Sequence, residues 1–219
     1  MINIFLKGAT FWTFFYIRIP SNSINLNKKT KREYIMKLKL KEICEYFSKD
    51  FTASETSKIL NLSRPTVNYY YKIFRESIIN DLFILKGNTF QVEYIKFRNE
   101  YFFYIINKNS IHLIEEHSKL SANLKIFIKN EIKKSLINNS KSNAIRILYN
   151  KHTQNFTVVG FYTSTLNLQE FINNRLKKFR GIKKENIYSH IKESVFRFNF
   201  SNNEINERIL KSLSIKQGL

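Results

Sequence analysis

Hydrophobic residues between positions 36 and 86 recur every three or four residues, which is the spacing of one face of an α-helix. Leu40, Ile43 and Phe47 show this spacing first, and Val67 and Phe74 continue it. The pattern predicts a helical unit over 36–86. Residues 1–35 form an N-terminal extension: an apolar stretch that we expect to be a strand or short helix, and then a polar, basic stretch expected to be a linker or the exposed start of a helix.

The hydrophobic pattern changes after residue 86. Segments rich in β-branched and aromatic residues predict strands at 89–97, 101–106, 111–115 and 156–162, the first three as an antiparallel meander. Helical spacing returns at 120–136, 166–179, 184–198 and 203–213. This order of helices, strands and helices predicts an α+β fold, in which residues 87–219 form a domain of their own.

The most specific local signal is a helix-turn-helix over residues 52–75, whose second helix continues to about Ser77. Its first helix, at about 54–60, is expected to turn Ile59 and Leu60 inward, and Asn61-Leu62 supplies the turn. Ser63 is a preferred N-cap residue and Pro65 suits a first helical turn, so the second helix is predicted at 64–77.

That second helix should bury Val67, Tyr71 and Phe74. Its other face would then carry Arg64, Thr66, Asn68, Tyr69, Lys72 and Arg75. In a helix-turn-helix this face enters the major groove, where Arg pairs with guanine and Asn with adenine, while Lys and Tyr reach phosphates. The alternative is an ordinary helical hairpin with a solvated basic face.

The charge balance favours the DNA-binding interpretation. The chain has 37 Lys and Arg against 17 Asp and Glu, a formal net charge of +20 and a pI of about 9.9. So large an excess indicates a polyanionic partner, either nucleic acid or an anionic membrane surface. The codon bias of an AT-rich genome is an alternative explanation, but it should also enrich acidic residues, and only Asp50 and Asp81 are Asp.

A second basic cluster lies near the C-terminus and consists of Arg175, Lys177, Lys178, Arg180, Lys183 and Lys184. Cations at this density neutralise several phosphates, so we predict nucleic-acid contact here as well, with a solvated helix face as the alternative. Phe179 and Ile182 are expected to anchor the cluster, and Arg197 is expected to pack locally. Cys44 is expected in the core, and a single cysteine excludes an intramolecular disulfide framework.

Several of these segments carry a family resemblance. Residues 53–75 (ASETSKILNLSRPTVNYYYKIFR) resemble the N-terminal helix-turn-helix of small bacterial insertion-sequence transposases, the group related to the eukaryotic Merlin elements. Residues 175–182 (RLKKFRGI) and 188–199 (YSHIKESVFRFN) are similar to the group's C-terminal signature, and residues 101–111 to its second strand and hairpin. The resemblance implies an RNase H-like core after the DNA-binding unit, here a trimmed mixed-sheet domain with C-terminal helices.

The resemblance also implies DNA cleavage with two divalent metals, which need acidic ligands. The first acidic position of the group aligns on Ile95, the second near residues 142–144 and the third on Leu166, and no acidic residue stands at any of them. Asn173 aligns with the group's basic residue. The chain therefore resembles a transposase that has lost its catalytic acids.

Two glutamates are candidate catalytic substitutes. Glu93 lies on the same strand face as Ile95, and Glu170 lies one helical turn beyond Leu166. Two glutamates without a central Asp would hold a metal poorly, so we expect both to be solvated surface carboxylates. No metal or other cofactor is expected, and Mg²⁺ or Mn²⁺ would bind only if cleavage activity is retained.

The sequence thus predicts a transposase-like, non-catalytic protein that binds double-stranded DNA in the cytoplasm, associated with the nucleoid. Because the group's transposases act as dimers or larger assemblies, the resemblance implies a homo-oligomer. Neither a small-molecule substrate nor a membrane partner is expected. Two alternatives stay open: an active transposase with displaced carboxylates, and a basic membrane-peripheral protein that works through residues 1–20.

Overall fold

The computed structural model describes residues 28–78, 89–107, 110–134, 142–150, 152–153, 155–179 and 181–217. The chain divides into two compact units, residues 1–38 and residues 39–219. The described part of the first unit belongs to helix α1 (Lys28–Ser48). The basic stretch is therefore helical from Lys28, one of its two expected forms, whereas the apolar residues 1–20 lie outside the described residues.

A five-stranded sheet with the order β3-β2-β1-β4-β5 forms the β part of an α+β fold, and that fold class is confirmed. The predicted strands are present as β1 (Thr89–Phe97), β2 (Glu100–Asn107), β3 (Ser110–Leu113) and β5 (Asn155–Tyr162). The sequence pattern missed β4 (Ala144–Asn150). Arg98 and Asn99, both at positive φ (48° and 65°), make the tight turn between β1 and β2.

The expected mixed sheet is wrong, because every pairing among the described strands is antiparallel. The register gives the reason. Leu113, at the end of β3, and Ala144, at the start of β4, are both level with the Glu93–Tyr104 pair in the middle of the sheet. The chain therefore enters β4 from the end of the sheet at which it left β3, and β4 runs opposite to β1.

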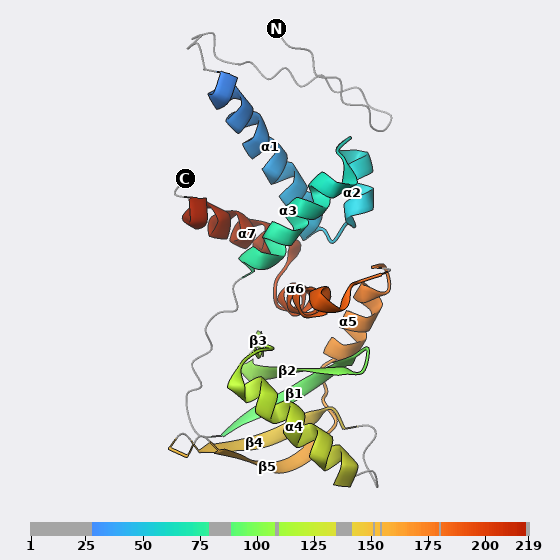
Figure 1. Ribbon diagram of the computed structural model, residues 1–219, viewed down its shortest axis with the longest axis vertical. Helices are drawn as coiled ribbons and strands as arrows, with labels where there is room; N and C mark the ends of the chain where they lie inside the picture. Colours follow the sequence, from blue (N-terminus) through green and yellow to red (C-terminus); the bar gives the residue numbers. More distant parts are fainter. Residues whose placement is uncertain are drawn as a thin grey trace. The chain divides into compact units, whose positions relative to one another are not determined.

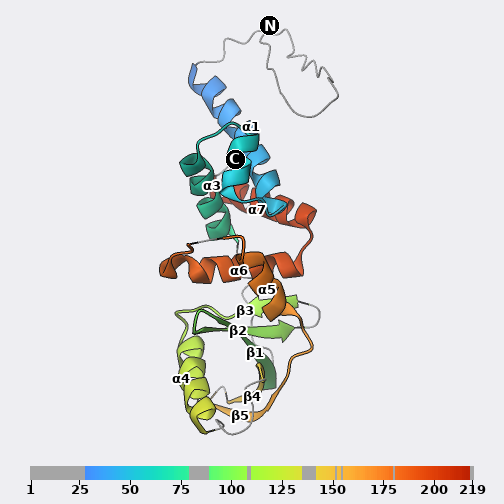
Figure 2. The same cartoon turned by 90° about the vertical axis from the view of Figure 1, so that its right-hand side faces the viewer.

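Helices cover both faces of the sheet (Figures 1 and 2). On one face α4 (Lys119–Lys134) buries Leu124 against Val92, Phe103 and Ile145. On the other face α5 (Leu168–Leu176) and α6 (Ile187–Asn199), which follows a 3₁₀ turn at Lys184–Asn186, share a core with β1, β2 and β3. This second core contains Ile95, Phe102, Tyr104, Ile111, Leu113, Leu168, Ile172, Leu176, Ile182, Ile187, Ile191 and Val195.

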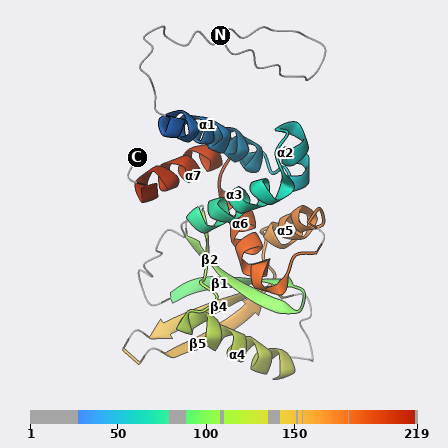
Figure 3. The ribbon, with the colours of Figure 1, turned by 45° about the horizontal axis from the view of Figure 1, so that its top comes forward.

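A third core belongs to helices alone: α1 from Lys39 onward, α2 (Ala53–Ile59), α3 (Arg64–Ser77) and α7 (Asn202–Gln217) (Figure 3). Its buried residues are Ile43, Cys44, Phe47, Ala53, Val67, Tyr71, Phe74, Ile205, Ile209 and Leu213. The predicted bounds of the second helix, the inward face of Val67, Tyr71 and Phe74, and the burial of Cys44 are confirmed. The C-terminal helix α7 thus completes the core of the predicted 36–86 unit.

The inward face of α2 differs from the prediction. Leu60 packs against the helical core, but Ile59 is 49% exposed. Because α2 begins at Ala53, positions 53, 56 and 60 share its buried face, and Thr56 takes the place expected for Ile59. The Thr56 hydroxyl lies 2.7 Å from the buried Tyr71 hydroxyl, so this polar group has a partner.

Replacing Ile209 with Ala tests the contribution of α7 to the helical core. Ile209 is 1% exposed, and truncating such a side chain costs about 2–5 kcal/mol of unfolding free energy. Glu207→Ala, at an exposed position of the same helix, should change it by less than about 0.5 kcal/mol. Urea unfolding followed by circular dichroism measures both, and equal values would contradict the placement of α7.

Candidate nucleic-acid interface

Two capped helices and a tight turn build the segment that the sequence predicts as a helix-turn-helix. At the start of α2, the Thr52 hydroxyl accepts from the Glu55 N–H (3.3 Å), and the Glu55 carboxylate accepts from the Thr52 N–H (2.7 Å). Asn61, with φ of 50°, turns the chain between the helices. At the start of α3, the Ser63 hydroxyl accepts from the Thr66 N–H (3.2 Å). The local sequence therefore sets where both helices begin.

One face of α3 is exposed along its N-terminal half. Arg64, Thr66, Asn68, Tyr69 and Lys72 are all exposed; Tyr69 is 63% exposed, and the Lys72 side chain 76%. Lys72 makes a long ion pair (3.9 Å) with the exposed Glu76. Such a solvent-exposed ion pair contributes little to stability. These side chains are therefore free to meet a partner.

Arg75, the sixth side chain assigned to this face, is placed differently. Its side chain is 15% exposed, and its Nε donates to the Glu193 carboxylate at 2.7 Å. The guanidinium also lies 5.9 Å from the centre of the Phe47 ring. Arg75 is thus held inside the protein and cannot extend to a phosphate. Its assignment to the interface is corrected because helical position 75 turns toward α6.

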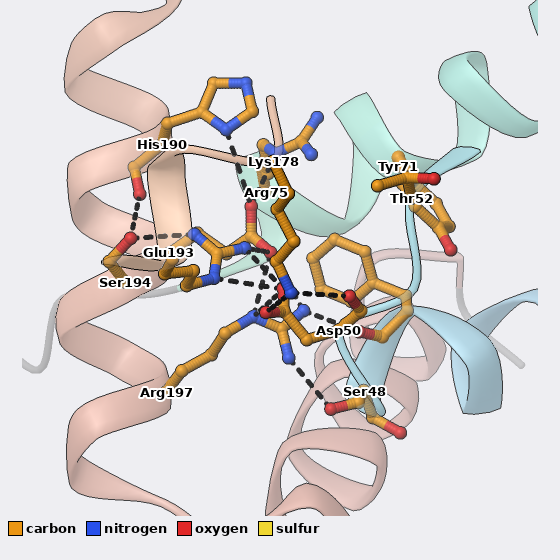
Figure 4. Close-up of polar contacts among 12 residues, drawn as sticks. Ser48, Asp50, Thr52, Tyr71, Arg75, Lys178, His190, Glu193, Ser194 and Arg197 are labelled. Atoms are coloured by element: carbon orange, nitrogen blue, oxygen red, sulfur yellow. Dashed lines mark hydrogen bonds and ion pairs between the residues drawn. The ribbon is translucent and has the colours of Figure 1, made fainter. Parts of the chain in front are cut away.

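Glu193 is the centre of a buried ion network that joins α3, α5 and α6 (Figure 4). Its carboxylate is 1% exposed and accepts from Arg75, from Arg175 and, at 2.9 Å, from Arg197 Nε. Arg175 also donates to the Asp50 carboxylate, with its Nη2 at 2.8 Å. Arg197 donates to the Ser48 carbonyl at 2.8 Å and to that of Phe47, so its packing is confirmed, but these two partners are 149 and 150 positions away in the sequence and are not local as predicted.

Burial and the charges of the network together set the protonation of two groups. Burial alone would raise the pKa of Glu193, but the positive charges of Arg175, Arg75 and Arg197 outweigh burial and lower its pKa far below the usual 4.5. Burial and then the Arg75 charge lower the pKa of His190 from 6.5 to about 4. Glu193 is therefore ionised and His190 neutral at pH 7.

The C-terminal basic cluster is divided by the fold. Arg175 is 3% exposed, so its predicted nucleic-acid contact is corrected: the guanidinium is enclosed by Asp50, Glu193 and Ser194. Lys178, about two-fifths exposed, binds the Asp50 carboxylate. Exposed at the surface are Lys177, Lys183 and Lys184, whereas Arg180 lies outside the described residues.

The anchoring predicted for this cluster is confirmed. Ile182 is buried, and Phe179 packs against the same core beneath α5 and α6. Gly181, at φ of 79°, provides the turn between them. The exposed cations beyond this turn make surface ion pairs, Lys184 with Glu100 (3.3 Å) and Lys183 with Glu185 (3.9 Å). Because the lysine of each pair is exposed to solvent, it would exchange its carboxylate readily for a phosphate.

The two candidate catalytic glutamates differ from each other. Glu93 is 1% exposed and accepts from the Tyr104 and Ser164 hydroxyls and, at 2.9 Å, from the Gln91 amide, so the expectation of a solvated surface carboxylate is wrong for it. It faces inward because its partner across the sheet, Tyr104, is buried on the same face. Glu170, in contrast, is exposed.

The positions aligned with the missing acids lie close together. Asn143 and Leu166 line one open groove, and Leu166 packs against the core that contains Ile95. Glu170 and Asn173 line the same groove. Among the described residues, no group of three or more His, Cys, Asp or Glu side chains could hold a metal ion.

Substituting Glu193 with Gln tests the ion network. Removing one member of a buried ion pair costs about 3–5 kcal/mol, because the remaining charges lose their partner. Because the folded pKa lies below the unfolded value of 4.5, this stabilisation is present above pH 4.5 and is lost as the pH falls below it. Urea unfolding measures the free energy of unfolding of Glu193→Gln and wild type. The difference between them should be large at pH 7 and smaller at pH 3.5. Glu170→Gln makes the same chemical change at the surface and should have little effect at pH 7.

A second pH effect is expected from His190. Its folded pKa of about 4 lies below the unfolded 6.5, so protonation favours the unfolded chain, and wild type loses up to about 3 kcal/mol as the pH falls from 6.5 to 4. His190→Gln should remove this part of the pH dependence, whereas His117→Gln, at an exposed position, should preserve it. The melting temperatures of the three proteins are measured at pH 7, 6 and 5. If the melting temperature falls with pH equally in wild type and His190→Gln, the prediction is wrong.

No family model, curated protein or solved structure matches this chain. Among the helices of the described residues, none is both long and apolar enough to cross a membrane. The exposed face of α3, the basic residues after α5 and the groove beside α5 are therefore the features from which a function can be inferred.

Proposed function

We propose that this chain binds double-stranded DNA by inserting the N-terminal half of α3 into the major groove. The observation that carries the proposal is the division of α3 into two faces. Val67, Tyr71 and Phe74 are fully packed in the helical core, while the polar side chains opposite them are exposed. Because the buried face of α3 is packed in the core, its exposed face can contact DNA without a rearrangement of the helix.

The chemistry of the exposed face suits base recognition. Arg64 offers a guanidinium for guanine and Asn68 a carboxamide for adenine, one helical turn apart. Lys72 and Tyr69 are suited to phosphates beside the groove. The exposed Lys177, Lys183 and Lys184 would add contacts that depend on charge and not on sequence.

We further propose that the protein descends from the Merlin-related group of insertion-sequence transposases and has lost their catalytic acids. The support is the resemblance of residues 53–75, 175–182 and 188–199, and the absence of acidic residues at the three aligned positions. An RNase H-like core is not part of the proposal, since the all-antiparallel sheet departs from the mixed sheet which that core implies. Assembly into oligomers rests on the resemblance alone.

DNA recognition can be tested with duplexes selected by the full chain from a random-sequence pool. Arg64→Ala/Asn68→Ala should weaken binding of the enriched duplex at least about tenfold, because each good base contact contributes about 1–3 kcal/mol. The matched control is Arg146→Ala/Asn155→Ala, which removes the same two side-chain types from exposed positions of the sheet. Fluorescence anisotropy over a salt series measures both variants.

The outcomes separate the alternatives. Equal losses in the two double variants would show that general charge, and not α3, binds DNA. Strand cleavage in Mg²⁺ or Mn²⁺ would support an active transposase and contradict the loss of catalysis. Retained membrane binding and absent DNA selection would favour the membrane-peripheral alternative, which deletion of residues 1–20 should then abolish.

A further inference from the structure

Half of the residues that line the groove beside α5 carry carboxamide side chains. The groove has a volume of about 790 Å³ and lies between the end of β1, the segment before β4 and helix α5. A space of this size holds a ligand much larger than a single inorganic ion. Lys177 and Glu170 are its charged residues, and its carboxamides are Asn143, Asn167, Gln169, Asn173 and Asn174.

Hydrogen bonds set the orientation of four of these amides. Asn143 Oδ1 accepts from the Ser164 backbone N–H at 2.7 Å, and Asn174 Oδ1 accepts from the Lys177 ammonium at 2.9 Å. Gln169 binds the Lys96 backbone twice, accepting from its N–H (2.8 Å) and donating to its carbonyl (3.1 Å). A backbone N–H and an ammonium can only donate, so the oxygen of each amide must face them.

The same constraint extends to Asn173. The Gln169 amide nitrogen donates to Asn173 Oδ1 at 3.1 Å. The oxygens of Asn143, Asn173 and Asn174 are therefore all engaged within the protein, and their NH₂ groups remain. No acceptor for these NH₂ groups is found among the residues that the structure describes. Asn173 and Asn174 are exposed, so their donors reach solvent.

We propose that this groove binds phosphate oxygens of a nucleic-acid strand through the NH₂ groups of Asn143, Asn173 and Asn174 and the Lys177 ammonium. Because the oxygens of these amides are already hydrogen-bonded within the protein, the groove offers mainly donors and favours a ligand rich in acceptors. Phosphodiester oxygens accept strongly from amides and ammonium groups. The choice of nucleic acid rests on the proposed function and on the net charge of +20. Free phosphate has the same acceptor chemistry, but it would fill only a small part of the groove.

Glu170 predicts the direction in which a change of charge in the groove alters ligand affinity. Its carboxylate lines the groove and would repel a phosphate, so removing its charge should strengthen binding. If the groove bound a cation instead, Glu170 would be a ligand, and removing its charge should weaken binding. Asparagine-to-aspartate substitutions must act in the opposite direction to Glu170→Gln in both cases.

The central variant is Asn143→Asp/Asn173→Asp in the full chain. A carboxylate oxygen can still accept from Ser164 and Gln169, so the internal hydrogen bonds persist while two donors become two negative charges. The matched control is Asn155→Asp/Asn203→Asp, which makes the same charge change at exposed positions in β5 and α7. The probe is a fluorescein-labelled oligothymidylate, because a single strand lacks the major groove that α3 would read.

We expect the groove variant to bind the oligothymidylate at least about tenfold more weakly and the control to lose less than about threefold. Glu170→Gln should bind it about threefold more tightly, and it provides a second test if the double variant fails to fold. Arg64→Ala/Asn68→Ala should bind the single strand as wild type does, which separates this proposal from duplex recognition by α3.

Three results would overturn the proposal. Equal weakening of the groove and control variants would assign the effect to general charge. Weaker binding of Glu170→Gln, with Mg²⁺ uptake that the aspartate variant increases, would make the groove a cation site. If inorganic phosphate displaces the oligothymidylate at an equal concentration of phosphate groups, free phosphate is the ligand of the groove.

Discussion

The buried carboxylate of Glu193 is the interaction on which the arrangement of the large unit depends. It is surrounded by guanidinium groups from α3, α5 and α6, and Asp50 before α2 binds three cations of the same network. A buried charge is costly unless it is paired, so the four segments must meet in a single geometry for every charge to be satisfied. Hydrophobic packing brings the helices together, and the ion pairs add a requirement for distance and direction at each guanidinium.

This constraint separates structural from available cations. In the sequence, Arg75, Arg175 and Arg197 cannot be told apart from the basic residues near them. In the structure, all three are paired with Glu193 inside the protein. Among the residues proposed to contact DNA, those that stay exposed are the face of α3 that begins at Arg64 and the lysines beyond α5. The basic residues of the sequence are therefore not equally available to a ligand, because those in the network neutralise Glu193 and Asp50 inside the protein.

The two candidate contacts differ in chemistry, which suits different parts of one ligand. The exposed face of α3 carries arginine and asparagine, the residue types that pair with guanine and adenine, and its reverse side is packed in the helical core. The groove beside α5 is lined by amides whose oxygens are already bonded, so it offers donors for phosphate and little means of reading sequence.

The sequence by itself determined the local elements. The N-cap at Ser63, Pro65 and the spacing of Val67, Tyr71 and Phe74 predicted α3 and its two faces, because capping and helical periodicity act within a few residues. Only the tertiary structure decided which charges are buried, that Glu93 faces inward, that α7 closes the helical core, and that β4 runs antiparallel to β1. These features depend on contacts between residues far apart in the chain: Arg75 and Glu193 are 118 positions apart, and no local pattern encodes such a pairing.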